Sequence, residues 1–138
     1  MIAAGLTTGT NRCIQGNTGA CHSGGHMYQT IKNTADISKD DLGFSGVTMQ
    51  LLSGDGPTGG MYVQMTMAPG ARIPAHHHTG ANEFGYIVSG DFIEAGTTYG
   101  PGTVFFGIAG TTHGPHTSVT GCVVLTHYSA PLDFVPAT

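Results

Sequence analysis

The stretch that decides the fold is residues 70–83, which read GARIPAHHHTGANE. On an extended strand, residues two apart point to the same side, so His76 and His78 project together while His77 points the other way. A short turn after the third histidine would bring Glu83, at the start of the next strand, back beside this pair. Two imidazoles and one carboxylate on neighbouring strands make up half of the coordination shell of a metal ion.

The rest of the shell must come from elsewhere, and His113 is the best candidate because it lies on an expected strand after a glycine-rich loop. Three neutral imidazoles and a carboxylate suit a divalent first-row metal and leave coordination positions open. Iron, manganese, nickel, copper and zinc all accept such ligands. A closed structural zinc site would favour cysteine ligands, which the chain does not offer at this point.

Short strands separated by glycine and proline surround this stretch, which predicts an all-β fold. Met61, Met65 and Met67 lie on one face of an alternating strand, and we interpret them as core packing. Turn signals recur about every 8 to 12 residues, the spacing of a β-sandwich or barrel. We expect a small antiparallel jelly-roll barrel with one helical turn over 37–42 and strands over 44–52, 61–67, 83–89, 92–99, 103–108, 112–118 and 122–128.

The order of these residues resembles the first conserved motif of the cupin superfamily. That motif places a Gly, two His, a Glu and a Gly at fixed spacing, and the sequence fits it at Gly70, His76, His78, Glu83 and Gly90. The second motif resembles residues 102–117, where His113 keeps the ligand position while Ile108 and Thr117 replace a proline and an asparagine. The sequence looks most like the branch that contains the cupin domains of zinc-dependent anti-sigma factors and the iron dioxygenases that cleave acetylacetone or dihydroxyacetophenone.

The resemblance implies a double-stranded β-helix, the cupin form of the jelly roll. It also implies a bound metal ion, for which Fe(II) is the first expectation, held by His76, His78, His113 and Glu83. It also implies a metal-dependent dioxygenase that cleaves a carbon–carbon bond in a small chelating diketone, enolate or hydroxyketone. We expect catalytic roles for Glu83, for His116, which a bend before it would turn towards the site, and for Tyr86 as a proton donor or base. Two alternatives stay open: a lyase or isomerase that works without dioxygen, and a non-catalytic domain that senses a metal or ligand.

Composition and charge exclude other classes of protein. The 138 residues hold 4 Lys+Arg against 8 Asp+Glu, with no basic cluster to neutralise phosphates, so we expect no nucleic-acid partner. No apolar run approaches the roughly 20 residues that span a bilayer, and no signal peptide is visible. We therefore expect no membrane partner and a cytoplasmic location, with a periplasmic one left open. The expected partners are a small-molecule substrate and a second copy of the chain, because open sheet edges favour pairing, with residues 28–43 adding to the partner's sheet.

The chain divides into a Gly/Thr-rich N-terminal arm over residues 1–27, interpreted as poorly ordered, and a cupin domain over residues 28–138. Residues 24–27 resemble a vector junction, which leaves open whether the whole arm is native. Cys13 and Cys21 could close a small loop in an oxidising compartment. Cys122 sits in an apolar run and is expected to be a buried thiol.

Overall fold

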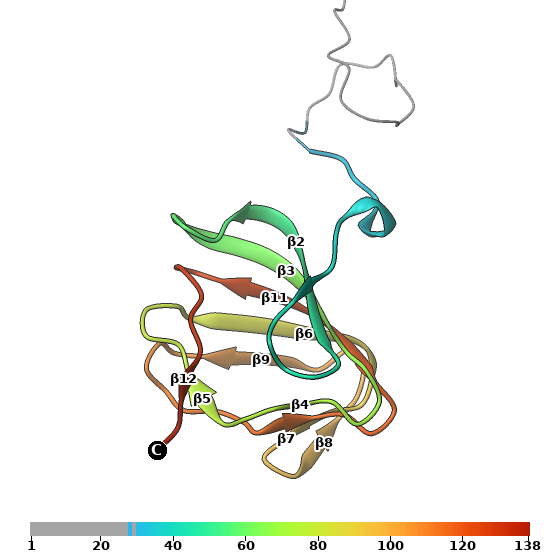
Figure 1. The fold of residues 1–138 in the computed structure, drawn as a ribbon, viewed down its shortest axis with the longest axis vertical. Coiled ribbons are helices and arrows are strands. Elements are labelled where there is room, and N and C mark those ends of the chain that lie inside the picture. The colour runs from blue at the N-terminus through green and yellow to red at the C-terminus, as the bar shows by residue number, and fades with distance from the viewer. Residues whose placement is uncertain (1–27, 29) are drawn as a thin grey trace, which may run out of the picture. The chain divides into compact units, whose positions relative to one another are not determined.

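The computed structural model describes Tyr28 and residues 30–138, and within them Lys32–Thr138 form one compact unit of short strands (Figure 1). The helical structure of the described residues is a single 3-10 turn, η1 (Thr34–Asp36), and none of it is long and apolar enough to cross a membrane. The strands are β1 (Asp40–Asp41), β2 (Val47–Asp55), β3 (Gly59–Met67), β4 (Arg72–Ile73), β5 (His76–His77), β6 (Glu83–Gly90), β7 (Phe92–Glu94), β8 (Thr97–Tyr99), β9 (Val104–Gly107), β10 (His116–Thr117), β11 (Cys122–Tyr128) and β12 (Val135–Pro136).

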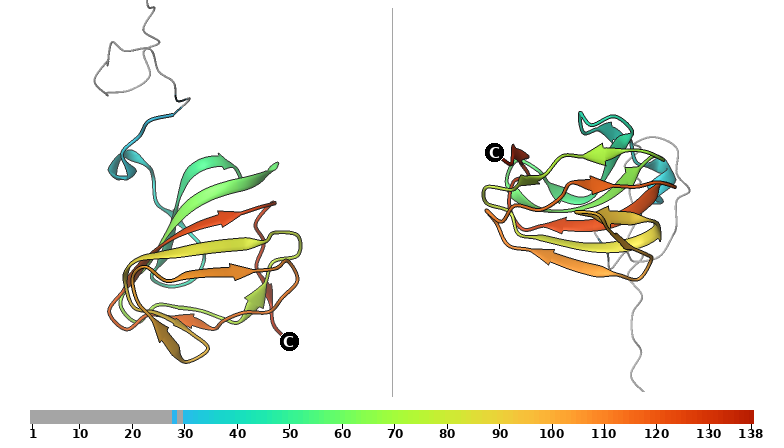
Figure 2. Two further views of the ribbon diagram at one scale, coloured as in Figure 1. Left: turned by 180° about the vertical axis from the view of Figure 1, so that it is seen from behind. Right: turned by 90° about the horizontal axis from the view of Figure 1, so that it is seen from below.

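The strands form two layers (Figure 2). One layer is a six-stranded sheet in the order β1-β2-β3-β11-β6-β9, and the other consists of the four-stranded sheet β4-β10-β7-β8 and the pair β12-β5. All pairings between these strands are antiparallel, and neighbours such as β3 and β11 lie far apart in the sequence. This arrangement confirms the predicted all-β jelly roll.

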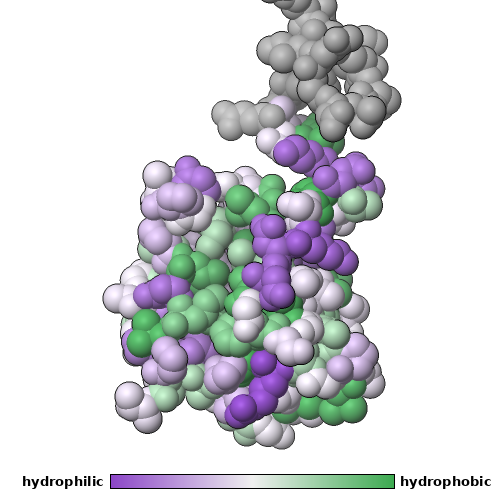
Figure 3. Space-filling view, viewed as in Figure 1, coloured by the Kyte–Doolittle hydropathy of each residue, from purple (hydrophilic) through white to green (hydrophobic). Residues whose placement is uncertain are grey.

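The core lies between the layers and follows the alternation of the strands. Every second residue of β3 from Met61 to Met67 is buried, which confirms the interpretation of the methionine stripe as core packing. Cys122 is a buried thiol, as expected from its apolar surroundings. Hydrophobic side chains also reach the surface between polar ones on the face seen in Figure 3.

The structure corrects the expected helical turn over residues 37–42. The helical residues are Thr34–Asp36, capped by the side chain of Asn33, and the chain is extended by Asp40–Asp41. The side chain of Gln50 explains the difference, because its Nε2 donates to the carbonyls of Thr34 and Ile37, at 2.7 Å each. The segment is thereby held against β2 and continues as a strand.

Two further differences concern strand lengths. The single strand expected over 92–99 is a hairpin of β7 and β8, because Ala95 and Gly96 both adopt positive φ and turn the chain. The strand expected over 112–118 contracts to β10, which follows a cis peptide bond between Gly114 and Pro115.

The structure places part of one of the two expected arms. Asp40–Asp41, part of the segment expected to join a partner's sheet, pair with β2 of their own sheet. The arm predicted over residues 1–27, including Cys13 and Cys21, lies outside the described residues.

Candidate metal centre

Backbone pairing brings together two histidines that lie 37 residues apart in the chain. His76 begins β5, and His113 forms an isolated antiparallel bridge with it. Each donates its N–H to the carbonyl of the other, at 3.0 Å and 2.9 Å. Because directly opposed residues of antiparallel strands point to the same face, the two imidazoles lie side by side.

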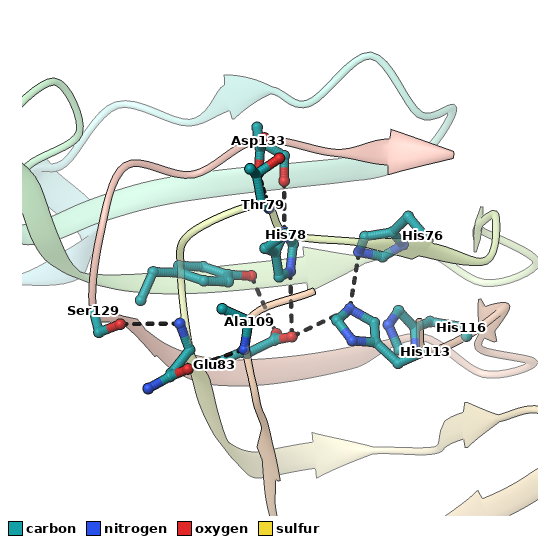
Figure 4. A network of polar contacts seen from close by, with 12 residues as sticks. His76, His78, Thr79, Glu83, Ala109, His113, His116, Ser129 and Asp133 are labelled. Atoms are coloured by element: carbon teal, nitrogen blue, oxygen red, sulfur yellow. Dashed lines mark hydrogen bonds and ion pairs between the residues drawn. The ribbon is translucent and has the colours of Figure 1, made fainter. Parts of the chain in front are cut away.

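The four residues predicted as ligands converge between the layers (Figure 4). The Nε2 atoms of His76 and His113 are 3.1 Å apart, and Oε2 of Glu83 lies 3.4 Å from Nε2 of both His78 and His113. One ring nitrogen from each of the three histidines lies within 4.8 Å of the other two, a spacing that could hold a metal ion. His76, His78 and Glu83 are buried, and His113 is half-buried.

The far nitrogens of two rings are held by backbone carbonyls. Nδ1 of His76 donates to the carbonyl of Pro74 at 2.8 Å, and Nδ1 of His78 donates to that of Asp133 at 2.5 Å. A carbonyl can only accept, so Nδ1 carries the hydrogen and Nε2 of each neutral ring has a free lone pair. Nε2 of His78 is buried without a hydrogen-bond partner. A cation would satisfy this lone pair, so the donor set fits a metal.

The electrostatics of the cluster keep two imidazoles neutral. Burial lowers the pKa of His76 to about 4 and also lowers the pKa of His113. Burial acts in the same direction on His78, but the nearby Glu83 carboxylate and the Asp133 carbonyl outweigh it, so the pKa of His78 is raised. Burial would raise the pKa of Glu83, yet the nearby histidines lower it, and the carboxylate stays charged.

Glu83 is oriented by Tyr128, which sequence analysis did not single out for the site. The Tyr128 hydroxyl donates to Oε1 of Glu83 at 3.2 Å. Burial raises the pKa of Tyr128 well above its ordinary value, which keeps this hydroxyl protonated. Oε2 of Glu83 is therefore left to face the histidines.

His116 forms a second polar pair beside the cluster. Its ring centroid is 5.3 Å from that of His113, and its Nδ1 lies 2.5 Å from Oε2 of Glu94. Oε1 of Glu94 accepts the N–H of Gly114 at 2.6 Å. Sequence reasoning missed Glu94, because only the register of β7 against β10 places it directly opposite His116.

A cavity of about 300 Å³ opens onto the site. Its apolar wall includes Ile87, Phe92 and Phe105, and its polar lining consists of Glu83, Glu94, His113 and His116 together with Tyr99 and Thr103. The cavity thus has the size and the mixed lining of a small-molecule site, and two of the candidate ligands, Glu83 and His113, line it.

The structure does not bring Tyr86 to this site. Glu83 and Ile87 point inward from β6, and Tyr86 has the opposite parity, so its side chain lies on the outer face of the sheet and is 42% exposed. A direct role for Tyr86 in proton transfer is inconsistent with this orientation. His116, by contrast, lies at the cavity as the sequence predicted.

One family of known proteins matches the sequence. The sequence model of the ChrR cupin-like domain matches residues 27–131. No curated protein sequence matches the chain.

Solved structures resemble the fold at low sequence identity. The polyketide cyclase RemF from Streptomyces resistomycificus is 16% identical, with a TM-score of 0.67, over 80% of this chain and 87% of that chain. An acetylacetone dioxygenase from Acinetobacter johnsonii is 19% identical, with a TM-score of 0.63, over 85% and 84%. The complex of Rhodobacter sphaeroides SigE with the anti-sigma ChrR is 21% identical, with a TM-score of 0.56, over 69% and 50%. Together with the family match, these findings confirm the resemblance seen in the motifs: the chain belongs to the ChrR cupin-like family.

Proposed function

We propose that this protein is a metal-dependent enzyme, an Fe(II) dioxygenase that cleaves a carbon–carbon bond in a small chelating diketone, enolate or hydroxyketone. The observation that carries the proposal is the convergence of three imidazoles and Glu83, two of which, Glu83 and His113, line a cavity that also has apolar walls. Manganese, nickel, copper and zinc fit the same ligands, and availability would decide between them.

The cavity favours a small anionic substrate that carries two oxygen donors. Its volume of about 300 Å³ is at the lower end for a small-molecule site. Neutral imidazoles at His76 and His113 would leave positive charge on the ion, which attracts an enolate. When bound, the metal would supply Lewis-acid activation of that substrate and a meeting point with dioxygen.

The His116–Glu94 pair is positioned to move the substrate proton. Glu94 holds the N–H of Gly114 and contacts Nδ1 of His116, which leaves Nε2 as the ring nitrogen able to accept a proton. Removing a proton next to a carbonyl gives the enolate, and both atoms of dioxygen then enter the two carbonyl products as one carbon–carbon bond breaks. Dioxygen is the only oxidant that this reaction requires.

Oxygen consumption tests the proposal. The apo-protein is loaded with Fe(II) under anaerobic conditions and mixed with a panel of β-diketones and hydroxyketones, and air is then admitted at an oxygen electrode. We expect no cleavage before air and one molecule of dioxygen consumed per substrate cleaved. Glu94→Gln should lower kcat more than it changes metal content. Equal product formation without dioxygen would exclude the oxygenase.

A second candidate is a metal-dependent lyase or isomerase that acts without dioxygen. The same His116–Glu94 pair favours it, because a base beside a Lewis acid suffices for proton abstraction and elimination. Anaerobic turnover in the assay above would identify this class. Tight metal binding with no turnover, either with or without dioxygen, would instead favour the remaining alternative, a non-catalytic domain that senses a metal or ligand.

We also propose a homodimer. Its support is the outer face of the six-stranded sheet, which exposes large hydrophobic side chains such as Tyr62, Phe84 and Phe106.

A further inference from the structure

The C-terminal segment, Leu132–Pro136, contacts His76 and His78 at several points. We call these residues the strap. In Figure 1 the chain leaves β11 and runs across the molecule to end beside β5. The family match stops at residue 131, so the strap lies beyond the part of the chain that the match covers.

Backbone pairing fastens the strap to the strand of the metal ligands. Val135 pairs with His77 and Pro136 pairs with His76, and the N–H of Ala137 donates to the carbonyl of Ala75 at 3.0 Å. β5 is only two residues long, and this pairing with β12 makes it part of a sheet.

Asp133 makes the contact that matters most for the site. Its carbonyl accepts the hydrogen from Nδ1 of His78 at 2.5 Å, and its Oδ1 accepts the N–H of Thr79 at 2.8 Å (Figure 4). The side chain of Asp133 thus anchors this residue to the loop that carries His78. This anchoring places the backbone carbonyl of Asp133 against the His78 ring. His76 needs no such remote partner, because its own Nδ1 donates to the backbone carbonyl of Pro74, two residues earlier in the chain.

Phe134 completes the strap as an apolar wall. Its ring centroid lies 4.8 Å from that of His76, 5.3 Å from that of His78 and 5.4 Å from that of Phe44. Packing on three rings fixes the backbone carbonyl immediately before it. Such packing also restricts the tilt of both imidazoles.

We propose that the strap is a positioning device that sets the tautomer and orientation of His78 for metal binding. An imidazole that donates from Nδ1 presents Nε2 to the metal, and loss of a partner of this kind costs about 10–100-fold in metal affinity. The inference rests on the proposed metal binding at the histidine cluster.

Two measurements test it together. The first is the dissociation constant for Co²⁺ and Zn²⁺ in the apo-protein, measured against a competing chelator. The second is a ¹H–¹⁵N NMR spectrum of the histidine rings in the apo-protein, recorded above the titration range of imidazole, which reports the nitrogen that carries the hydrogen. The variants are a chain that ends at Pro131 and Asp133→Ala. The control is Asp41→Ala on β1, which removes a similar contact, the one between the Asp41 carboxylate and the backbone N–H of Gly43.

In the wild-type chain we expect His76 and His78 both to carry the hydrogen on Nδ1. In the truncated chain His78 should shift towards the Nε2 form while His76 keeps its state, and metal affinity should fall about 10–100-fold. Asp133→Ala should also shift His78 towards the Nε2 form and lower the metal affinity, and Asp41→Ala should change neither the tautomer nor the affinity. Where the truncated chain does not fold, Asp133→Ala decides.

A folded variant that keeps the affinity within twofold and keeps the hydrogen on Nδ1 of His78 would overturn the inference. Failure of the proposed function is distinguishable from this outcome. A wild-type chain that binds no metal refutes the metal enzyme, whereas the tautomer of His78 in the apo-protein still reports on the strap.

Discussion

His78 is the ligand whose removal tests the centre most directly. It is 2% exposed, and its Nε2 lies 3.4 Å from Oε2 of Glu83 but has no hydrogen-bond partner among the described residues, so this nitrogen is free to bind a metal ion. We expect His78→Ala to abolish metal binding and turnover, with a cost in the free energy of unfolding of about 1–3 kcal/mol. Elemental analysis and thermal unfolding of untagged protein measure the two effects.

The neighbouring residue supplies the matched control. His77 ends β5 directly before His78, but its side chain has the opposite parity, and it is not part of the cluster. His77→Ala should keep full metal content. Equal metal loss in both variants would contradict the assignment of the ligand by strand parity.

Glu83 is the second residue whose role a substitution resolves. Its Oε2 lies 3.4 Å from the ring nitrogens of His78 and His113, and its Oε1 accepts from Tyr128. Glu83→Gln keeps the shape and an acceptor for Tyr128 but removes the negative charge. We expect metal affinity, measured by chelator competition, to fall at least about 10-fold. Unchanged affinity would mean that the three histidines bind the metal without Glu83.

At the scale of elements, Asp91 ties the turn after β6 to the loop after β10. Its carboxylate accepts the N–H groups of Val119 and Thr120, at 2.7 Å and 2.8 Å, and the hydroxyls of Ser118 and Thr120. The Thr120 hydroxyl and these N–H groups lower the pKa of Asp91 well below its ordinary value of 3.8. The carboxylate is therefore the form that stabilises the fold.

The sign of the pH effect follows from that lowered pKa. The stabilisation is fully present above pH 3.8 and is lost as the pH falls towards the lower pKa of the folded state. We expect Asp91→Asn to lower the Tm at neutral pH, and we expect the difference from wild type to shrink in more acidic solution. Thermal unfolding over a pH series measures this, and a Tm difference that grows on acidification would contradict it.

The packing of β6 against β9 depends on the absence of a side chain at Gly85. A Cβ added there would overlap the ring of Phe105, which lines the cavity and stacks on Phe92. We expect Gly85→Ala to destabilise the fold by about 1–3 kcal/mol in denaturant unfolding, because the ring must move.

Gly100→Ala is the control for this packing effect. Gly100 has open space around its Cβ position and no positive φ, so the substitution should change stability little. Equal effects of the two substitutions would show that the clash with Phe105 is relieved at no cost.

At the scale of the whole molecule, the outer face of the six-stranded sheet is apolar over β3, β11, β6 and β9. We call it the outer sheet face, and its exposed large hydrophobic side chains are Tyr62, Phe84, Tyr86, Val88, Val104, Phe106 and Leu125, with Ile108 directly after β9. These four strands hold one charged residue, Glu83, and it points inward. The four aromatic rings alone leave on the order of 400 Å² open, about half of what one partner contributes to a stable interface.

A second copy of the chain suits this face, because two uncharged faces related by a two-fold axis meet without unpaired charges. We expect a dimer by light scattering and a monomer for Phe106→Lys, since Phe106 is 64% exposed on the edge strand β9. Val119→Lys, at an equally exposed position on a loop, should remain dimeric. A monomeric wild-type chain would contradict the proposal.

The sequence by itself determined the fold class, because alternation along short strands and regular turns are local properties. It also determined the candidate ligands of β5 and β6, since spacing along a strand fixes which side chains share a face. His113 was found through the motif resemblance and a glycine-rich loop. The single strand expected over 92–99 was wrong, because a turn at Ala95 and Gly96 leaves a weak signal in a β-rich stretch.

Only the tertiary structure decided which distant groups orient the site. Glu94 reaches His116 through the register of β7 and β10, Tyr128 reaches Glu83 across β11 and β6, and the carbonyl of Asp133 meets a ring 55 residues away. These contacts depend on strand register and on a backbone carbonyl, which any residue type carries, so composition and spacing contain no signal for them.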